Sequence, residues 1–240
     1  MSAGDPSRIR ALVFDVFGTV VDWRASIAGE VAAVAESRGL RVDGGAFADA
    51  WRAGYQPAMR RVASGAVPWA TIDVLNREIL DTLLPGFGLE GLDERERAHL
   101  NFAWHRLDPW PDAVAGLQRL KRRWPIATLS NGNVSLLVAL ARHGGLPWDT
   151  VLSAELIEKY KPDLAVYRMA TRLLGIADSE LVLVAAHPSD LDAAREAGLM
   201  TAYVHRPLEY GRDHRAEALP PGRFDWQTRD FADLASQLGA

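Results

Sequence analysis

The sequence contains no cysteine among its 240 residues. Disulfides, thiolate nucleophiles and zinc–thiolate sites are therefore excluded. An excess of basic charge is lacking as well: the formal net charge is −4, which gives no electrostatic basis for binding nucleic acid or an anionic membrane. No apolar run approaches the length of a membrane span, and the first six residues lack the apolar stretch of a signal peptide. We therefore expect a soluble, cytoplasmic protein that binds neither nucleic acid nor membranes.

What the chain does contain is enough apolar sequence for a full core, since 48% of its residues are hydrophobic and 24% charged. Apolar runs typical of buried strands occur at 9–14, 126–129, 181–186 and 201–204, with weaker ones near 151–153 and 224–226. Helical patterns lie between the later runs, at 111–122, 134–142, 164–174 and 190–197. Strands that alternate with helices predict an α/β protein with a parallel, doubly wound sheet.

The first strand breaks this alternation, because everything between it and the run at 126–129 looks helical. Helical patterns occur at 26–38, from Asp43 onward, at 69–84 and at 93–107. A helical block inserted after the first strand of an α/β sheet is most simply a cap over the carboxyl edge of the sheet. We therefore expect a catalytic core made of residues 6–22 and 109–240, and a helical cap made of residues 23–108.

The most informative segment is 11–20, in which an apolar run delivers Asp15 into a glycine-containing turn and Thr19 follows four residues later. In open α/β sheets the reactive groups lie outside the carboxyl ends of the strands, so Asp15 is expected where chemistry occurs. The alternative is an aspartate that merely caps the next element.

Further polar residues follow the later strands. Ser130 and Asn131 follow the run at 126–129, Lys161 follows the element near 151–153, and Asp190 follows the run at 181–186. Each signal is weak by itself, since Ser-Asn-Gly is also a common turn and Lys-Pro a common surface pair. Their shared position at strand ends of one sheet, in this order, is specific.

This pattern resembles the haloacid dehalogenase superfamily over nearly the whole chain. Its four motifs correspond to Asp15–Thr19, Ser130–Asn131, Lys161 and Asp190. The subgroup that it resembles is the type II (S)-2-haloacid dehalogenases, through Asp15-Val-Phe-Gly-Thr, Ser130-Asn-Gly-Asn and Tyr160-Lys-Pro. The resemblance implies a Rossmann-like core with a helical cap, in agreement with the layout expected above.

The carboxylates that are absent distinguish a dehalogenase from a phosphatase. Superfamily phosphatases carry a second aspartate two residues after the nucleophile, where this chain has Phe17, and a magnesium-binding aspartate where it has Ala186. A halide leaves without a proton, so dehalogenation needs neither group. We therefore expect hydrolysis of short 2-haloalkanoic acids with no metal or other cofactor. A phosphatase acting on a small phosphorylated metabolite and a non-catalytic binding member remain as alternatives.

The resemblance also implies roles for the motif residues. Asp15 attacks C2 of the 2-haloacid, halide leaves, and water hydrolyses the resulting aspartyl ester to the 2-hydroxy acid. Lys161 keeps Asp15 ionised, Thr19 positions it, and Asp190 orients Lys161 or the water. Lys161 as a solvated surface lysine is the alternative, which applies better to Lys159.

The substrate-binding residues follow in the same way. Ser130 and Asn131 supply donors to the substrate carboxylate, and Arg52, which flanks an aromatic stripe of the cap, receives the halide. Tyr167 matches a family tyrosine near the nucleophile, and Phe17 lies at the substrate site. The alternatives are a solvated helix arginine for Arg52 and a core aromatic for Tyr167. The partners implied are the small 2-haloacid and halide, together with a second copy of the chain in a homodimer.

The fourth motif departs from the subgroup, because Ala185 and His187 stand where serine and asparagine are common. A histidine can donate to a halide or accept from water, whereas alanine can do neither. We therefore hypothesise that His187 shifts the preference toward haloacetates, including fluoroacetate. A plain loop residue is the alternative for His187.

Overall fold

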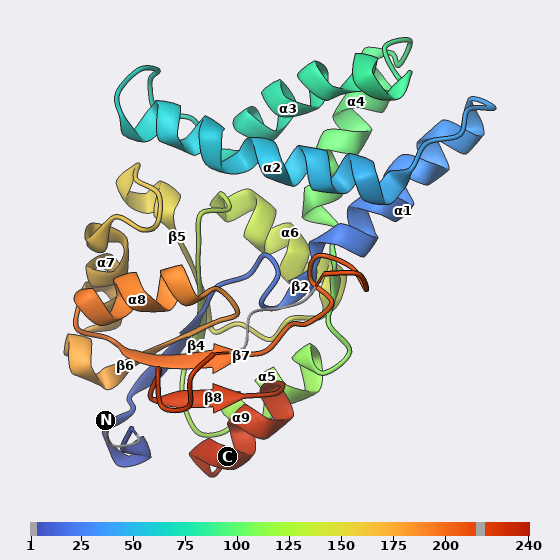
Figure 1. Ribbon diagram of the computed structural model, residues 1–240. Helices are drawn as coiled ribbons and strands as arrows, with labels where there is room; N and C mark the ends of the chain where they lie inside the picture. Colours follow the sequence, from blue (N-terminus) through green and yellow to red (C-terminus); the bar gives the residue numbers. More distant parts are fainter. Residues whose placement is uncertain (1–3, 215–218) are drawn as a thin grey trace.

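The computed structural model describes residues 4–214 and 219–240, so that residues 215–218 of the expected core lie outside the described residues. Its main sheet has six parallel strands in the order β5-β4-β1-β6-β7-β8 (Figure 1). The strands are β1 (Ala11–Phe14), β4 (Ile126–Ser130), β5 (Thr150–Ser153), β6 (Leu181–Ala185), β7 (Met200–Val204) and β8 (Trp226–Thr228). The α/β fold with a parallel sheet, predicted from the alternation of strands and helices, is confirmed.

Helices cover both faces of this sheet, as its side chains require. On β1, Leu12 and Phe14 pack into one apolar cluster, and Ala11 and Val13 pack into another on the opposite face. The first cluster includes side chains of α5 (Ala113–Lys121), α6 (Val134–Gly144) and α9 (Phe231–Leu238). The second includes side chains of α7 (Leu164–Leu174) and α8 (Pro188–Glu196). The strands are therefore buried on both sides, and polar groups gather at the ends of the strands.

The segment between β1 and β4 is mostly helical, but the prediction that all of it is helical is wrong, because two short strands, β2 (Val21–Asp22) and β3 (Asp108–Pro109), lie within it. It contains α1 (Trp23–Ser37), α2 (Gly44–Ala63), α3 (Ile72–Leu83) and α4 (Glu94–Asn101), which lie together on one side of the sheet (Figure 1). Short 3-10 turns follow at Leu84–Phe87 and Phe102–His105, and others lie at Pro6–Arg8, Ala154–Ile157 and Asp178–Glu180. Among the described residues, none of these helices is both long and apolar enough to cross a lipid bilayer.

The two connections between the inserted helices and the sheet run side by side. They pair as a short antiparallel ribbon of β2 (Val21–Asp22) and β3 (Asp108–Pro109). Beyond the ribbon, Trp110 donates its backbone N–H to Val20 O and its indole Nε1–H to Gly18 O, both at 2.9 Å. The ribbon lies at the expected limits of the 23–108 cap, whose division from the core stays a prediction.

Several expected element bounds are wrong by a few residues, each for a local reason. The 93–107 helix ends at Asn101 and continues as a 3-10 turn, a change that apolar periodicity cannot reveal. The first helix starts at Trp23 rather than 26, because the Asp22 side chain caps it by accepting from Ala25 N. The last strand begins only at Trp226, because Asp225 turns its side chain to the backbone of Thr201. Helix α8 begins at Pro188, before the predicted start at 190, because proline is favoured in a first turn.

The contact between α5 and α9 depends on a residue without a side chain. A Cβ added at Gly116 would lie 2.3 Å from the Phe231 Cβ. We predict that Gly116→Ala lowers the free energy of unfolding by about 1–3 kcal/mol, because α9 must move away from α5. Gly29→Ala in α1 is the matched control, since nothing lies within 4 Å of its added Cβ, and it should gain up to about 1 kcal/mol. Urea unfolding measures both, and equal effects would contradict this account of the contact.

Candidate active site

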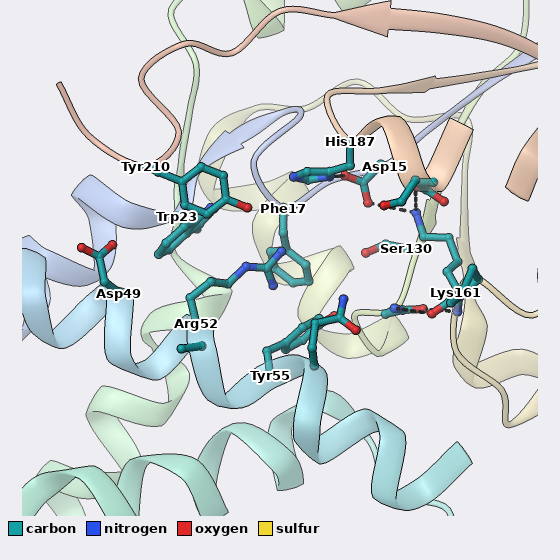
Figure 2. Close-up of a pocket in the computed structure, with 16 residues that line it drawn as sticks. Asp15, Phe17, Trp23, Asp49, Arg52, Tyr55, Ser130, Lys161, His187 and Tyr210 are labelled. Carbon is teal, nitrogen blue, oxygen red and sulfur yellow. Dashed lines mark hydrogen bonds and ion pairs between the residues drawn. The ribbon is translucent and has the colours of Figure 1, made fainter. Parts of the chain in front are cut away.

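A cavity of about 650 Å³ lies between the carboxyl ends of the strands and helix α2 (Figure 2). Its walls come from both parts of the chain: Asp15, Lys161, His187 and Asp190 lie on the sheet side, and Trp23, Asp49, Arg52 and Tyr55 lie on the helical side. The residues that line it include Asp15, Phe17, Trp23, Arg52, Tyr55, Ser130, Asn131, Lys161, His187, Asp190 and Tyr210. The cavity therefore brings together most of the residues that the sequence singled out.

Asp15 lies at the base of this cavity with both carboxylate oxygens held. It follows β1 directly, and its backbone N–H donates to Val184 O at 3.0 Å. Oδ1 accepts from Lys161 Nζ at 2.9 Å, and Oδ2 accepts from Thr19 Oγ1 at 2.8 Å. Thr19 Oγ1 in turn accepts from the N–H of Ala186 at 2.9 Å. The carboxylate is thus fixed from two sides of the sheet edge, and only 7% of the residue is exposed.

Lys161 joins Asp15 to the second aspartate of the site. Its ammonium also donates to Asp190 Oδ2, whose other oxygen accepts from the Tyr167 hydroxyl. Burial by itself would raise the pKa of Asp15, but Lys161 and then His187 hold that pKa far below its usual value. Burial would likewise lower the pKa of Lys161, and the two carboxylates raise it instead. Asp15 is therefore ionised at neutral pH. Tyr167 is not among the residues that line the cavity, and it contacts the site through its hydrogen bond to Asp190.

Ser130 and Asn131 lie where β4 ends, and both line the cavity; Figure 2 shows Ser130 near Asp15. The buried Ser130 Oγ accepts from Gly132 N at 3.2 Å, so its hydroxyl proton is free to be donated. Asn131 Oδ1 accepts from the backbone N–H of Lys161 at 2.7 Å. Asn131 therefore fixes the chain that carries the lysine, and Ser130 offers a donor to a ligand.

Arg52 reaches into the cavity from α2. Its guanidinium carbon lies 4.5 Å from the ring centre of Tyr55 and 5.6 Å from that of Trp23. Nη1 is buried and has no hydrogen-bond partner among the described residues. An unpaired buried N–H on a cation is costly, and an anion would satisfy it. In Figure 2 the guanidinium lies beside Phe17 and faces the cavity that contains Asp15. The geometry suits a small anion between Arg52 and the sheet edge.

His187 is held between two carboxylates, one of which was missed in the sequence. Its Nδ1 lies 3.1 Å from Asp15 Oδ2, and its Nε2 lies 2.9 Å from Glu209 Oε1. Glu209 is only 4% exposed and also accepts from the Trp23 indole Nε1 at 3.1 Å. The available signal was its position, because Glu209 lies in the segment that follows the strand at 201–204.

Gly18, in the Asp15–Thr19 motif, leaves the space that the Glu209 side chain occupies. Gly18 has a φ of +82°, which glycine adopts readily, and a Cβ at this position would lie 2.1 Å from Glu209 Oε1. The glycine therefore serves two purposes: it makes the turn after Asp15, and it leaves space for a carboxylate from the loop after β7.

The two carboxylates also set the charge of His187. Burial lowers the pKa of the imidazolium, but Glu209 and Asp15 outweigh burial and raise that pKa to about 10. Both ring nitrogens therefore carry protons at neutral pH and donate to the carboxylates. A donation to halide, as hypothesised for this histidine, would require one of these contacts to be given up, and that role stays a prediction.

The residues around Asp15 do not fit a magnesium ion. Among the described residues, no group of three or more His, Asp or Glu side chains is arranged to hold a metal. The position between Asp15 and Asp190 is taken by the Lys161 ammonium, which contacts both carboxylates. Phe17 and Ala186 supply no oxygen ligands from their side chains.

Comparisons with known proteins agree with this geometry. A family model described as haloacid dehalogenase-like hydrolase matches residues 9–198. The (S)-2-haloacid dehalogenase 1 of Pseudomonas sp. (strain CBS-3) is 33% identical over 213 residues, covering 84% of this chain and 88% of that protein. The crystal structure of the defluorinating L-2-haloacid dehalogenase Rha0230 has a TM-score of 0.94 at 44% identity, with 100% of both chains covered. That of the L-2-haloacid dehalogenase from Xanthobacter autotrophicus with chloropropionic acid covalently bound has a TM-score of 0.80 at 26% identity, covering 97% of this chain and 99% of that one.

The charge of His187 can be measured directly. We predict that its imidazole is still protonated at about pH 8 and titrates near pH 10, and that Glu209→Gln lowers this pKa because one neighbouring negative charge is lost. The raised pKa means that the ring stabilises the fold fully below 6.5, its ordinary pKa, and that this stabilisation is lost as pH rises through about 10. NMR of ¹⁵N-labelled histidine follows the titration, and an ordinary pKa for His187 would contradict the contacts described.

Proposed function

The chain belongs to the haloacid dehalogenase-like hydrolases, and from this we propose that it hydrolyses short 2-haloalkanoic acids to 2-hydroxy acids through an ester on Asp15. The observation that carries the proposal is the Asp15 carboxylate, which is ionised, buried and fixed at both oxygens, beneath a cavity into which Arg52 brings an N–H that has no partner among the described residues. A poorly solvated carboxylate is a better nucleophile toward carbon than a hydrated one.

In the first half-reaction, a new bond forms between an Asp15 oxygen and C2 of the substrate. The C2–halogen bond breaks, and the halide leaves with the bonding electron pair. Oδ1 is the oxygen better placed to attack, because it has one donor, Lys161, whereas Oδ2 faces both Thr19 and His187. Attack from the side opposite the halogen inverts C2. The covalently bound chloropropionic acid in the Xanthobacter autotrophicus relative supports an ester intermediate.

The two negative ends of the substrate need donors at different places. Ser130 has a free hydroxyl proton, which supports a role in binding the substrate carboxylate. Arg52 has an unsatisfied N–H in an aromatic surround, which supports a role in receiving the departing halide. A halide needs no proton to leave, so neither Phe17 nor Ala186 limits this reaction, although both argue against a phosphatase.

We predict that Asp15→Asn lowers turnover of 2-chloropropionate by at least about 10³-fold, because an amide oxygen does not displace halide. In a single turnover of the wild type in H₂¹⁸O, the label should enter the Asp15 carboxylate, as read by mass analysis of the peptide that contains it. The matched control is Asp192→Asn, which changes an exposed carboxylate paired with Arg195 and should leave turnover unchanged. If the label enters the hydroxy acid in the first turnover, water attacks C2 directly and the ester is excluded.

We also predict that chelation has no effect on dehalogenation. Lys161 supplies the positive charge between Asp15 and Asp190 that a divalent ion would otherwise provide. Halide release from 2-chloropropionate should be the same in EDTA as in added magnesium, and p-nitrophenyl phosphate with magnesium should remain intact. Activity lost in EDTA and restored by magnesium would contradict the metal-independent mechanism.

A further inference from the structure

The proposed attack on C2 assigns no role to two charged residues of the site, His187 and Glu209. Lys161 and Thr19 hold the nucleophile, and Arg52 and Ser130 face the substrate. His187 and Glu209 are nevertheless buried as an ion pair against Asp15. Burying an ion pair costs free energy because both groups lose their hydration. Buried charged groups with perturbed pKa values are concentrated at functional sites, so this pair is a candidate for a role in the reaction.

We propose that His187 is the base that activates water for hydrolysis of the Asp15 ester, and that Glu209 is the positioning residue that holds it for this step. The inference rests on the proposed function, since it concerns the second half of that reaction.

The contacts of the ring support this assignment. Nε2 faces both oxygens of Glu209, at 2.9 and 3.1 Å, and therefore keeps its proton when the ring is neutral. Nδ1 is then the acceptor, and it points to the carboxyl group of Asp15, 3.1 Å from Oδ2. This nitrogen lies beside the carbon atom that water must attack. Asp190 is less suited to be the base, because Lys161 and Tyr167 already occupy its two oxygens.

Formation of the ester changes His187 from a proton donor to a proton acceptor. In the free enzyme the ring faces Asp15 from β1 and Glu209 from the loop after β7, with Lys161 on the far side of Asp15. Alkylation removes the negative charge of Asp15, so that only Glu209 still stabilises the imidazolium at these contacts, and the pKa of the ring falls. In the proposed mechanism the ring releases its proton at this stage, and this is the proton that accompanies halide in the overall reaction. Neutral His187 is thus produced only when an ester is present to be hydrolysed.

The second half-reaction then balances in protons and electrons. Water oxygen bonds to Cγ of Asp15, one water proton moves to His187 Nδ1, and the carbonyl electron pair moves onto Oδ2, which Thr19 faces with its hydroxyl. Collapse breaks the bond between Cγ and the ester oxygen, and the departing 2-hydroxy acid takes the proton from Nδ1. The Asp15 carboxyl group gives its remaining proton back to Nδ1, which restores the ion pair.

The test is pre-steady-state turnover of 2-chloropropionate by His187→Phe and Glu209→Gln. Both variants should release one equivalent of chloride per site at a rate within a few-fold of the wild type, and then turn over about 100-fold or more slowly. Intact-protein mass should show the propionyl ester accumulating on Asp15. In Glu209→Gln, the pH of half-maximal ester hydrolysis should also fall, because the imidazolium has lost a neighbouring negative charge; a purely structural role would not move it.

Glu30→Gln is the matched control, since Glu30 pairs with His99 and Arg106 far from the cavity and should leave both half-reactions unchanged. Chloride release and hydroxy acid formation slowed equally, with no ester accumulated, would overturn the inference. If Glu209→Gln does not fold, His187→Phe carries the same test. A wild type that releases no chloride would refute the proposed function instead, so the two failures are distinguishable.

Discussion

The rest of the site depends on one ammonium group shared by two carboxylates. Asp15 and Asp190 lie on opposite sides of Lys161 Nζ in a place with little water. Without the lysine, two like charges this close would force one carboxyl group to take up a proton. The lysine can occupy this position because the backbone of Lys161 is fixed by Asn131 at the end of β4. The Asp15 carboxylate therefore owes its charge to an arrangement that spans four neighbouring parts of the sheet edge.

A balance of charge extends this arrangement across the whole cavity. Four carboxylates lie in or against the cavity: Asp15 and Asp190 contact Lys161, Glu209 contacts His187, and Asp49 contacts Arg24. A fourth cation, Arg52, comes from the helical side, and its buried Nη1 has no hydrogen-bond partner among the described residues. The cavity is thus close to neutral, and its remaining donor capacity lies on the helical side. A small anionic substrate completes the pairing, whereas a doubly charged phosphate ester would bring more charge than the site can match.

Residues at the end of a strand could be predicted from pattern alone, whereas Lys161 and Asp190, which lie several residues beyond β5 and β6, were identified by their order along the chain and by the family resemblance. Asp15 and Ser130 each stand at the end of a short apolar run, so pattern and topology together were enough to bring them to one edge. Glu209 stands five residues beyond the end of β7 in an irregular segment, and its approach depends on the space above Gly18 and on the Trp23 indole. Such tertiary contacts leave no periodic signal. The ends of elements are hard to predict for the same reason. The Asp225 side chain accepts a hydrogen bond from the backbone N–H of Thr201, and β8 begins only after this residue.

The ribbon of β2 and β3 has a mechanical consequence. If one strand alone connected the helical segment to the sheet, the segment could rotate about that connection in any direction. Two connections that are hydrogen-bonded to each other restrict this rotation and favour one axis. The Trp110 indole bonds to Gly18 O, which places this axis against the turn after Asp15. Opening of the helical segment to admit a substrate would therefore pull on the same turn that carries Thr19 and makes room for Glu209. Trp110 would transmit such a movement to the turn after Asp15 through its two hydrogen bonds, to Gly18 O and to Val20 O.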